Sequence, residues 1–260
     1  LHRPGAYESY SLVDVNRSGV PLMEIVGQPD LRSPEQARQY LIKLRTILQH
    51  LSVSTGNMEE GSFRCDANIS LRRPGAPLSR AKVEVKNMNS FRAVFQALGY
   101  EEQRLRELLT AGGELMSETR GWVDERGVTV LQRTKEYAHD YRYFPEPDLP
   151  PMEISPTWVE DLRARLPELP DSRRRRYTAE MGLSEYDAGL ITQSRPLADF
   201  FEEALKADSP LPLPDRAKKV ANWLLGDFAR LLNASGLEIS QVPMTPAHLM
   251  ELVNLVEAGR

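Results

Sequence analysis

The segment at 63–87, FRCDANISLRRPGAPLSRAKVEVKN, places acids and bases at alternate positions. In an extended chain Arg64 and Asp66 project to one side, because strand side chains alternate with a period of two. After a turn that contains Pro and Gly, the same alternation puts Glu84 and Lys86 on that side as well. Two carboxylates beside a Lys and an Arg could hold a hard cation and a phosphate together, since Mg²⁺ binds through one or two carboxylates plus substrate oxygens.

The same segment predicts the element that would position these groups. The positions expected to face inward are Phe63, Cys65, Ala67, Ile69, Leu71, Ala81, Val83 and Val85. We therefore predict an antiparallel hairpin with one buried and one polar face, and Asn68 would join the charged residues on the polar face. Two interpretations stay open: a solvated face of paired charges, which are common and individually weak, or a polar site on a rigid floor.

A loop ahead of the first strand adds two more carboxylates. In NMEEGSFRCDAN, residues 57–68, Glu59 and Glu60 precede a glycine that would let the chain turn into the strand that carries Asp66. Three acids at one end of the hairpin form a candidate cation site, and a solvated acidic loop is the alternative interpretation.

Other common sources of chemistry are missing from the sequence. It contains neither the Gly-x-x-x-x-Gly-Lys-[Ser/Thr] phosphate loop nor the Gly-x-Gly-x-x-Gly turn of dinucleotide-binding proteins. The histidines, which lack the spacing of zinc ligands, are His2, His50, His139 and His248. We expect each of them to be a surface or capping residue, which leaves the carboxylates as the chemical groups of interest.

Composition limits the class of protein. A chain of 260 residues that is 41% hydrophobic and 27% charged can form one large or two ordinary domains with proper cores. We expect neither secretion nor membrane insertion, because no apolar run reaches the length of a membrane span and no charged-then-apolar leader opens the sequence. The single cysteine, Cys65, excludes an internal disulfide, and we expect a buried, inert thiol in a reducing cytoplasm.

Residues 1–150 are predicted to mix strands and helices. Strand-like patterns occupy 11–16 and 20–26, and a hairpin is predicted from 122–124 and 128–132 around Glu125-Arg126-Gly127. Helices are predicted after the Ser33-Pro34-Glu35-Gln36 cap and over 90–110, where Gly112-Gly113 ends the pattern. Because the strands come in hairpins and not as βαβ units, we predict an α+β fold.

The second half is predicted to be helical. The Pro-rich stretch YFPEPDLPP, residues 143–151, is expected to be a stiff connector. The predicted helices cover 156–166, 172–181, 185–193, 196–207 and 215–232, and a further helix starts at Thr245-Pro246. Basic residues that could contact nucleic acid are Arg173, Arg174, Arg175, Arg176, Lys218 and Lys219. A solvated helix face is the alternative, because the net charge of the whole chain is −4 and residues 151–260 carry 13 Lys and Arg against 17 Asp and Glu.

Longer motifs resemble a known family. LVDVNRSGVPLMEIV, DLRSPEQARQYLIKLRTILQHLSVSTGNMEEGSFRCDANIS, VEVKNMNSF and HDYRYFPEPDLPP are similar to the GatB family, the B subunits of aspartyl/glutamyl-tRNA amidotransferases. The similarity covers most of residues 9–153 and continues more weakly through VANWLLGDFARLLN. It implies a two-step ligase in which ATP phosphorylates the side-chain carboxylate of Glu on tRNA(Gln) or Asp on tRNA(Asn). Ammonia then displaces phosphate to give the amide.

The resemblance also implies a domain organisation and a site. Residues 1–150 would belong to an antiparallel-sheet cradle similar to glutamine synthetase, 151–243 to a helical domain, and 244–260 to the start of a tail domain. The expected ligands of Mg²⁺ are Asp66, Glu84 and Glu60. The residues expected to contact ATP phosphates or the substrate carboxylate are Arg64, Lys86 and Asn68.

Partners are implied as well. An amidase subunit would supply ammonia through a tunnel, a small subunit would clasp the assembly, and the helical and tail domains would grip the tRNA. Family members begin with an additional stretch that has a Gly-Leu-Glu-Val-His motif and a Glu-rich loop, and this chain contains neither. We therefore expect a segment of a longer protein that lacks kinase activity by itself. The alternative is a tRNA-binding and assembly scaffold whose charged hairpin is structural.

Overall fold

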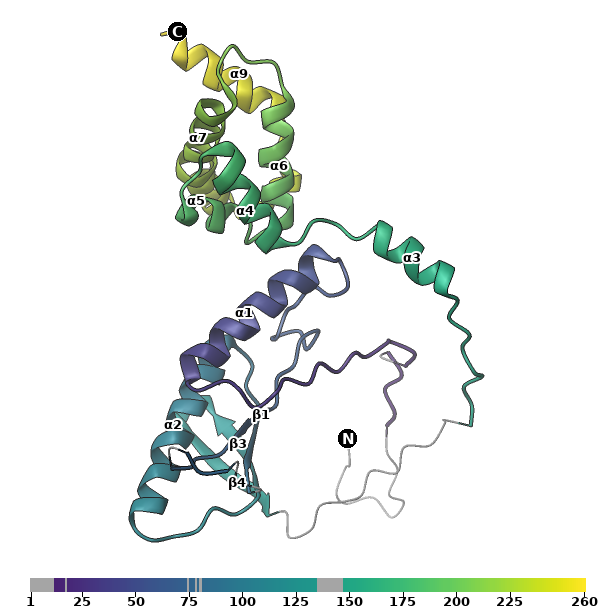
Figure 1. Ribbon diagram of the computed structural model, residues 1–260, viewed down its shortest axis with the longest axis vertical. Coiled ribbons are helices and arrows are strands. Elements are labelled where there is room, and N and C mark those ends of the chain that lie inside the picture. The colour runs from purple at the N-terminus through teal and green to yellow at the C-terminus, as the bar shows by residue number, and fades with distance from the viewer. Residues whose placement is uncertain (1–11, 17, 74, 78, 80, 135–146) are drawn as a thin grey trace. The chain divides into compact units, whose positions relative to one another are not determined.

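The computed structural model describes residues 12–16, 18–73, 75–77, 79, 81–134 and 147–260 (Figure 1). The chain divides into two compact units, 1–32 and 33–260. His2, His139 and the first part of the predicted connector lie outside the described residues.

In the first unit, the described residues contain turns but no strand, so the strands predicted at 11–16 and 20–26 are wrong. Apolar residues such as Val13 and Leu22, which are 82% and 93% exposed, pack against nothing that would stabilise a two-stranded hairpin.

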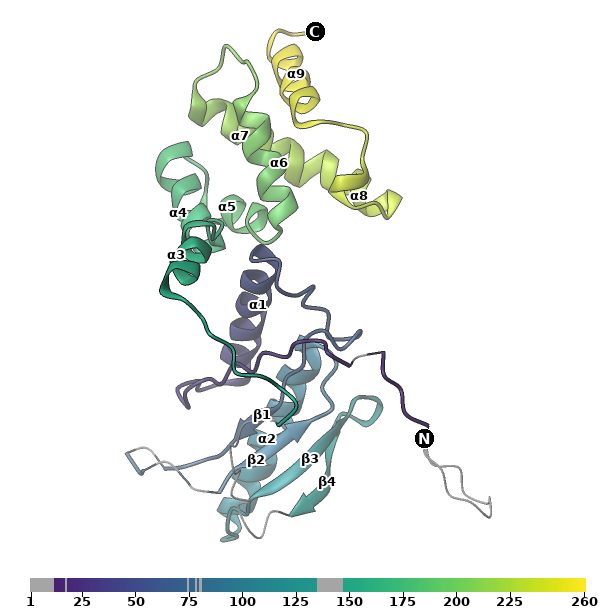
Figure 2. The ribbon, with the colours of Figure 1, turned by 90° about the vertical axis from the view of Figure 1, so that its right-hand side faces the viewer.

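In its described residues, the first part of the second unit contains two α-helices and a four-stranded sheet. Its elements are α1 (Pro34–His50), β1 (Ala67–Ile69), β2 (Val83–Lys86), α2 (Phe91–Thr110), β3 (Glu118–Val123), the short helix η1 (Asp124–Arg126) and β4 (Val128–Thr134). Figure 2 shows the strands side by side in the order β1-β2-β3-β4. Ser33 and Ser90 cap α1 and α2 by accepting bonds from backbone N–H groups three residues later.

The strand pairings confirm both predicted hairpins and correct the expected sheet type. β1 and β2 are antiparallel, as are β3 and β4, but β2 and β3 are parallel. The sheet is therefore mixed and not antiparallel. A parallel pair needs a crossover connection, and α2 provides it, so β2-α2-β3 is a βαβ unit of the kind that the hairpin pattern did not predict.

The apolar face of the sheet packs against the helices. Val83 and Val85 of β2 are 1% and 0% exposed, and they share a core with Val94 and Leu105 of α2 and with Leu48 of α1. Because strand side chains alternate, Glu84 and Lys86 lie on the face away from this core. The charged residues therefore lie on strands whose opposite face is held in place by packing against α1 and α2.

The remainder of the described chain is helical, as predicted. The helices are α3 (Pro156–Ala164), α4 (Pro170–Met181), α5 (Glu185–Ile191), α6 (Arg195–Lys206), α7 (Leu213–Trp223), η2 (Leu224–Phe228), α8 (Ala229–Ser235), η3 (Ile239–Gln241) and α9 (Pro246–Glu257). The helix predicted over 215–232 is interrupted at η2, where Gly226 has the non-helical angles φ −96° and ψ −107°. None of the helices in the described residues is long and apolar enough to span a membrane.

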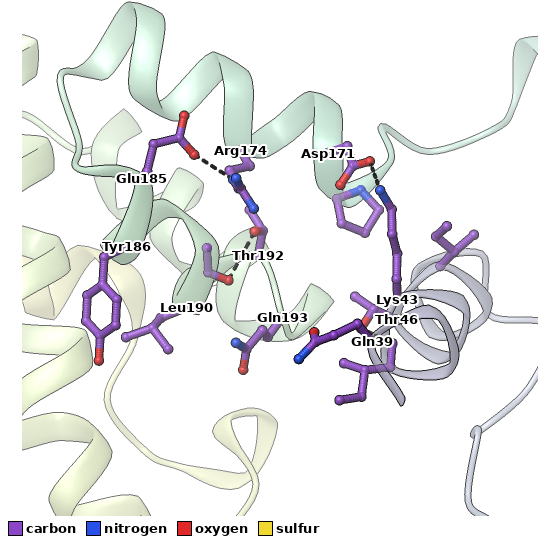
Figure 3. Close-up of a pocket in the computed structure, with 14 residues that line it drawn as sticks. Gln39, Lys43, Thr46, Asp171, Arg174, Glu185, Tyr186, Leu190, Thr192 and Gln193 are labelled. Carbon is purple, nitrogen blue, oxygen red and sulfur yellow. Dashed lines mark hydrogen bonds and ion pairs between the residues drawn. The ribbon is translucent and has the colours of Figure 1, made fainter. Parts of the chain in front are cut away.

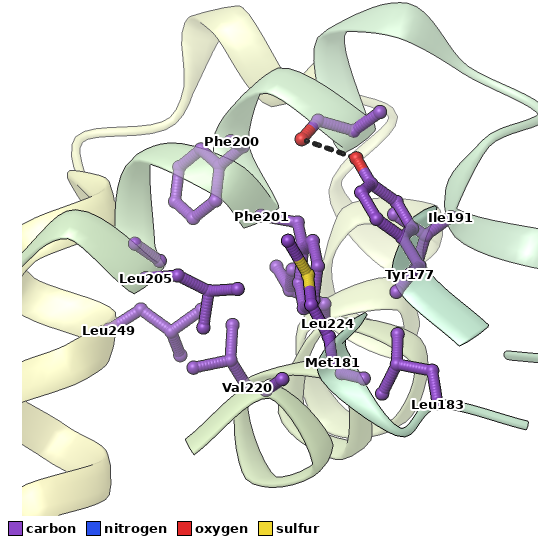
Figure 4. Close-up of a cluster of buried hydrophobic side chains, with 14 of the residues drawn as sticks. Tyr177, Met181, Leu183, Ile191, Phe200, Phe201, Leu205, Val220, Leu224 and Leu249 are labelled. Atoms are coloured by element: carbon purple, nitrogen blue, oxygen red, sulfur yellow. Dashed lines mark hydrogen bonds between the residues drawn. The ribbon is translucent and has the colours of Figure 1, made fainter. Parts of the chain in front are cut away.

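Figure 4 shows the core of this helical region. The rings of Tyr177 and Phe201 lie 5.1 Å apart, and both side chains are fully buried. Leu249 and Met250 of α9 belong to the same core as α4 and α6. The domain boundary expected at residue 243 stays a prediction.

Candidate active site

On the polar face of the sheet, the strand register places residues of neighbouring strands opposite one another at two levels. At the first level the register pairs Asn68 with Glu84, Glu84 with Thr119, and Thr119 with Arg133. At the second level Lys86 of β2 is opposite Gly121 of β3. The predicted charged face therefore exists, and it is wider than the first hairpin.

A Lys between two carboxylates lies at the centre of this face. The Nζ of Lys86 is 3.0 Å from Oδ2 of Asp66 and 3.4 Å from Oε1 of Glu84. The hydrogen bond to Asp66 raises the pKa of Lys86, and the charge of Glu84 acts in the same direction. Asp66 is 53% exposed and Glu84 only 16%, so the site has one accessible and one sheltered carboxylate. In this cluster the Lys86 ammonium can neutralise a phosphate, while the carboxylates of Asp66 and Glu84 can accept a cation.

Two residues that the sequence analysis missed extend the network toward β4. Thr119, which is 1% exposed, donates a hydrogen bond from Oγ1 to Oε2 of Glu84 at 2.9 Å. Arg133 donates from Nε to the same hydroxyl at 3.4 Å. The alternation within β3 could have placed Thr119 on a polar face, but only the pairing of β2 with β3 places it beside Glu84.

Amides lie beside the Lys. A Cβ at Gly121 would collide with the side-chain amide of Gln132 and lie 3.1 Å from Nδ2 of Asn87. Glycine at this position therefore makes room for both amides next to Lys86. A cavity of about 190 Å³ lies where β2 leads into α2, and its lining includes Asn87, Ser90 and Trp122. Both amides can donate hydrogen bonds to an oxyanion.

Glu60 and Arg64 are not part of this network. Glu60 is exposed in a loop where its backbone N–H donates to Oδ1 of Asn57 at 3.4 Å. Within the described part of the chain, no three His, Cys, Asp or Glu side chains are grouped as metal ligands would be. Arg64 is exposed just before β1. The two carboxylates that the structure brings together are thus Asp66 and Glu84.

Predictions for the cysteine and the histidines have mixed outcomes. Cys65 is partly buried, and burial raises the pKa of its thiol to about 11, in agreement with an inert thiol. His248 caps α9, where its Nδ1 accepts from the backbone N–H of Thr245. The surface or capping role expected for His50 is wrong, because this residue is 1% exposed and bonded through Nδ1 to the carbonyl of Thr46.

A second charged cluster, which the sequence analysis also missed, lies on the opposite face of the sheet. Glu101 of α2 is fully buried and lies 2.8 Å from Nη2 of Arg104 and 3.1 Å from Nε of Arg120. Glu118 pairs with both arginines, and the hydroxyl of Thr129 donates to Glu101. Despite the opposing effect of burial, the bond to Glu101 raises the pKa of Arg104. This cluster joins α2 to the strands that carry the front face.

The basic residues of the helical region do not form one cationic face. Arg173 pairs with Asp199 at 2.5 Å and is 12% exposed, whereas Arg176 pairs with Glu168 at 2.6 Å. The exposed members are Arg174, Arg175 and Lys218. Arg174 contacts Glu185 at 2.7 Å, Arg175 donates to Ser172 at 3.4 Å, and Lys219 contacts Glu257 at 2.6 Å.

A larger cavity of about 450 Å³ lies between α1 and the pair α4 and α5 (Figure 3). Lys43 of α1 reaches across it to Asp171 of α4, with 2.6 Å between Nζ and Oδ2. Arg174 and Tyr186 line the same cavity. An exposed arginine and an exposed tyrosine at its edge suit contacts with phosphate and with a base.

Comparison with known proteins identifies the family. The family model described as "GatB/GatE catalytic domain" matches residues 2–160, and the one described as "GatB domain" matches 199–260. The chain belongs to the GatB family. The resemblance inferred from the sequence motifs is confirmed, and the match to the GatB catalytic domain includes every residue of the polar face.

Curated relatives agree with this assignment. The chain is 56% identical to the B subunit of the "Aspartyl/glutamyl-tRNA(Asn/Gln) amidotransferase" of Dehalococcoides mccartyi strain CBDB1, over 97% of this chain and 52% of the relative. It is 54% identical to the protein of that name from Moorella thermoacetica and 51% identical to that from Thermomicrobium roseum, over 100% of this chain and 53% of each relative. The chain thus spans about half the length of these GatB proteins.

Proposed function

We propose that this chain contributes to the phosphorylation site of a glutamine-dependent tRNA amidotransferase. In the proposed reaction an oxygen of the Glu or Asp side-chain carboxylate on the misacylated tRNA attacks the γ-phosphorus of ATP, and ADP leaves. The resulting acyl phosphate is then attacked by ammonia at its carbonyl carbon. Phosphate leaves with the bonding electron pair, and loss of a proton from nitrogen gives the amide. A carboxylate is a poor electrophile, which is why the phosphorylation must come first.

The observation that carries this proposal is the position of Lys86 between Asp66 and Glu84 on the polar face. Phosphoryl transfer brings several negatively charged oxygens together, so a site must supply positive charge where that charge develops. The ammonium of Lys86 would contact a phosphate oxygen, and the amides of Asn68 and Asn87 are proposed to orient that phosphate. Arg64, which is exposed just before β1, is the second cation in the proposal, although within the described residues no contact joins it to Lys86.

The carboxylates suit a magnesium ion. Asp66 and Glu84 are hard oxygen ligands, and their shared contact with the Lys86 ammonium places them both around one positive charge. Mg²⁺ commonly takes one or two protein carboxylates and completes its shell with water and phosphate oxygens, so two ligands on this face are sufficient. Asp66 and Glu84 would hold the ion, which would supply positive charge to neutralise phosphate oxygens. Glu60 as a third ligand is the weakest part of the proposal, because the structure does not group it with the other two.

The helical region is proposed to bind the acceptor tRNA. Arg174 and Arg175 are exposed, and Arg174 lines the cavity between α1 and α4. Arg173 and Arg176 instead stabilise the helical core through Asp199 and Glu202. We further propose that an amidase subunit supplies the ammonia, that a small subunit joins the assembly, and that the enzyme is cytoplasmic.

The test is Asp66→Asn in the assembled three-subunit enzyme. Phosphorylation of the misacylated tRNA, glutamine hydrolysis and tRNA binding are measured separately, and Glu125→Gln in the β3-β4 turn serves as the control. We expect phosphorylation to fall by about 10²-fold or more, as when a group that stabilises transition-state charge is removed. Glutaminase activity and tRNA binding should stay. If all three activities survive, the polar face is a solvated surface and the chain is a binding and assembly scaffold.

A further inference from the structure

We infer that Arg133 is an oxyanion-binding residue of this site and that Thr119 is the positioning residue that connects it to Glu84. This inference rests on the proposed function and adds a specific assignment to it. The two residues lie on β3 and β4, outside the β1-β2 hairpin.

A continuous chain of contacts runs from Asp66, just before β1, across β2 and β3 to β4. Asp66, Lys86, Glu84, Thr119 and Arg133 follow one another, with each adjacent pair joined by a hydrogen bond or an ion pair of 2.9 to 3.4 Å. Their charges are negative, positive, negative, neutral and positive. Thr119 is the only neutral residue of these five, and its hydroxyl alone joins Arg133 to Glu84 within this chain of contacts.

The direction of each bond at Thr119 is fixed by chemistry. A guanidinium can only donate and an ionised carboxylate can only accept, so the hydroxyl must donate to Glu84 and accept from Arg133. Thr119 is 1% exposed, and water therefore has little access to replace either bond. Loss of the hydroxyl would remove one contact from the carboxylate of Glu84, which keeps its ion pair with Lys86, and one contact from the guanidinium of Arg133.

Arg133 is placed to bind an anion. Its side chain is exposed, and its bond to Thr119 uses Nε at the inner side of the guanidinium. The planar fork of Arg matches two oxygens of a phosphate or a carboxylate. Lys86 and Arg133 then flank the sheltered carboxylate of Glu84 from β2 and β4. The ligand is an oxyanion, which could be a phosphate of ATP or the side-chain carboxylate of the substrate.

The experiment measures KM and kcat of the assembled enzyme for ATP and for misacylated tRNA separately. We expect Arg133→Gln to raise KM by about tenfold or more for one substrate, since one good bidentate contact corresponds to about that factor. A rise for ATP identifies the phosphate, and a rise for the aminoacyl-tRNA identifies the carboxylate. Arg126→Gln in the same hairpin is the matched control and should leave both values unchanged.

Thr119 is tested by two substitutions, one that retains its shape and one that retains its hydroxyl. Thr119→Val retains the branched shape and removes the hydroxyl, whereas Thr119→Ser retains the hydroxyl. We expect kcat to fall about tenfold in the Val variant and to recover in the Ser variant, with the melting temperature measured for both. If Thr119 has only a structural role, kcat of the two variants should vary with their melting temperatures and not with the presence of the hydroxyl.

Failure of the inference can be distinguished from failure of the proposed function. If Asp66→Asn abolishes phosphorylation while Arg133→Gln changes neither KM, the inference is wrong and the proposed site survives. If Thr119→Val behaves like the unmodified enzyme, Thr119 does not position Glu84. If Asp66→Asn is itself without effect, both the proposed site and this extension are wrong.

Discussion

Glu101 offers the sharpest test of how the sheet is held. Its carboxylate is 0% exposed and faces two arginines, Arg104 and Arg120, which are 23% and 13% exposed. Glu101→Gln retains the side chain's shape and removes its negative charge. Removing one partner of a buried ion pair costs about 3–5 kcal/mol, because the other charge is left uncompensated. Glu118 still pairs with both arginines, so we expect a cost at the lower end of that range, about 3 kcal/mol.

Amide hydrogen exchange measures the loss of stability locally, in α2 and β3. A loss of about 3 kcal/mol corresponds to a rise of about 10²-fold in the population of the locally opened state. Peptides from α2 and β3 of the variant should exchange faster by about that factor, while peptides from α6 should not change. This separation is expected because α6 packs in a different hydrophobic core.

The neighbouring residue supplies the control. Glu102 is 37% exposed and forms one pair with Arg106, one helical turn away. Pairs of this kind contribute about 0.3–0.5 kcal/mol, so Glu102→Gln should change exchange less than about threefold. Similar exchange rates in the two variants would refute the reasoning that burial makes Glu101 important.

Two further predictions concern the helical region and its contact with α1. Reversing the exposed charges with Arg174→Glu and Arg175→Glu should weaken tRNA binding and reduce its salt dependence. The same reversal at Arg163 of α3 and at its C-cap Arg165 is the control. An unchanged salt slope would contradict phosphate contacts. Burial lowers the pKa of His50 below its usual 6.5, so the unfolded chain binds more protons and stability should fall as pH drops below about 6.5. Melting temperatures between pH 7.5 and 5.5 should fall less in His50→Gln, and equal slopes would contradict this cause.

The local parts of the fold could be predicted because their signals are local. Period-two alternation and a short turn predict the β1-β2 hairpin. The Ser33 cap predicted the start of α1, and the helix predicted over 90–110 is found as α2. The parallel pairing of β2 with β3 could not be predicted in this way. The whole of α2 separates the two strands, and nothing in their alternation determines which strand edges meet.

Runs of charge were the least informative signal. Arg173 to Arg176 are consecutive, and consecutive residues on an α-helix are rotated by about 100°, so four of them surround the helix. Two therefore face the helical core, where Asp199 and Glu202 neutralise them, and two face outward. The sequence shows four equivalent arginines, but the structure assigns them to two different physical roles.

The same distinction divides the two faces of β3. Behind the strand, Arg120 pairs with a fully buried carboxylate, so its charge is committed to holding the fold. In front of it, Asp66 and Lys86 are 53% and 31% exposed, and exposed pairs of this kind contribute only about 0–1 kcal/mol to stability. Stability alone therefore gives little reason for the front pair. In the proposed site these exposed charges are the ones that would meet a substrate phosphate, and the buried Glu101 cluster holds β3 behind them.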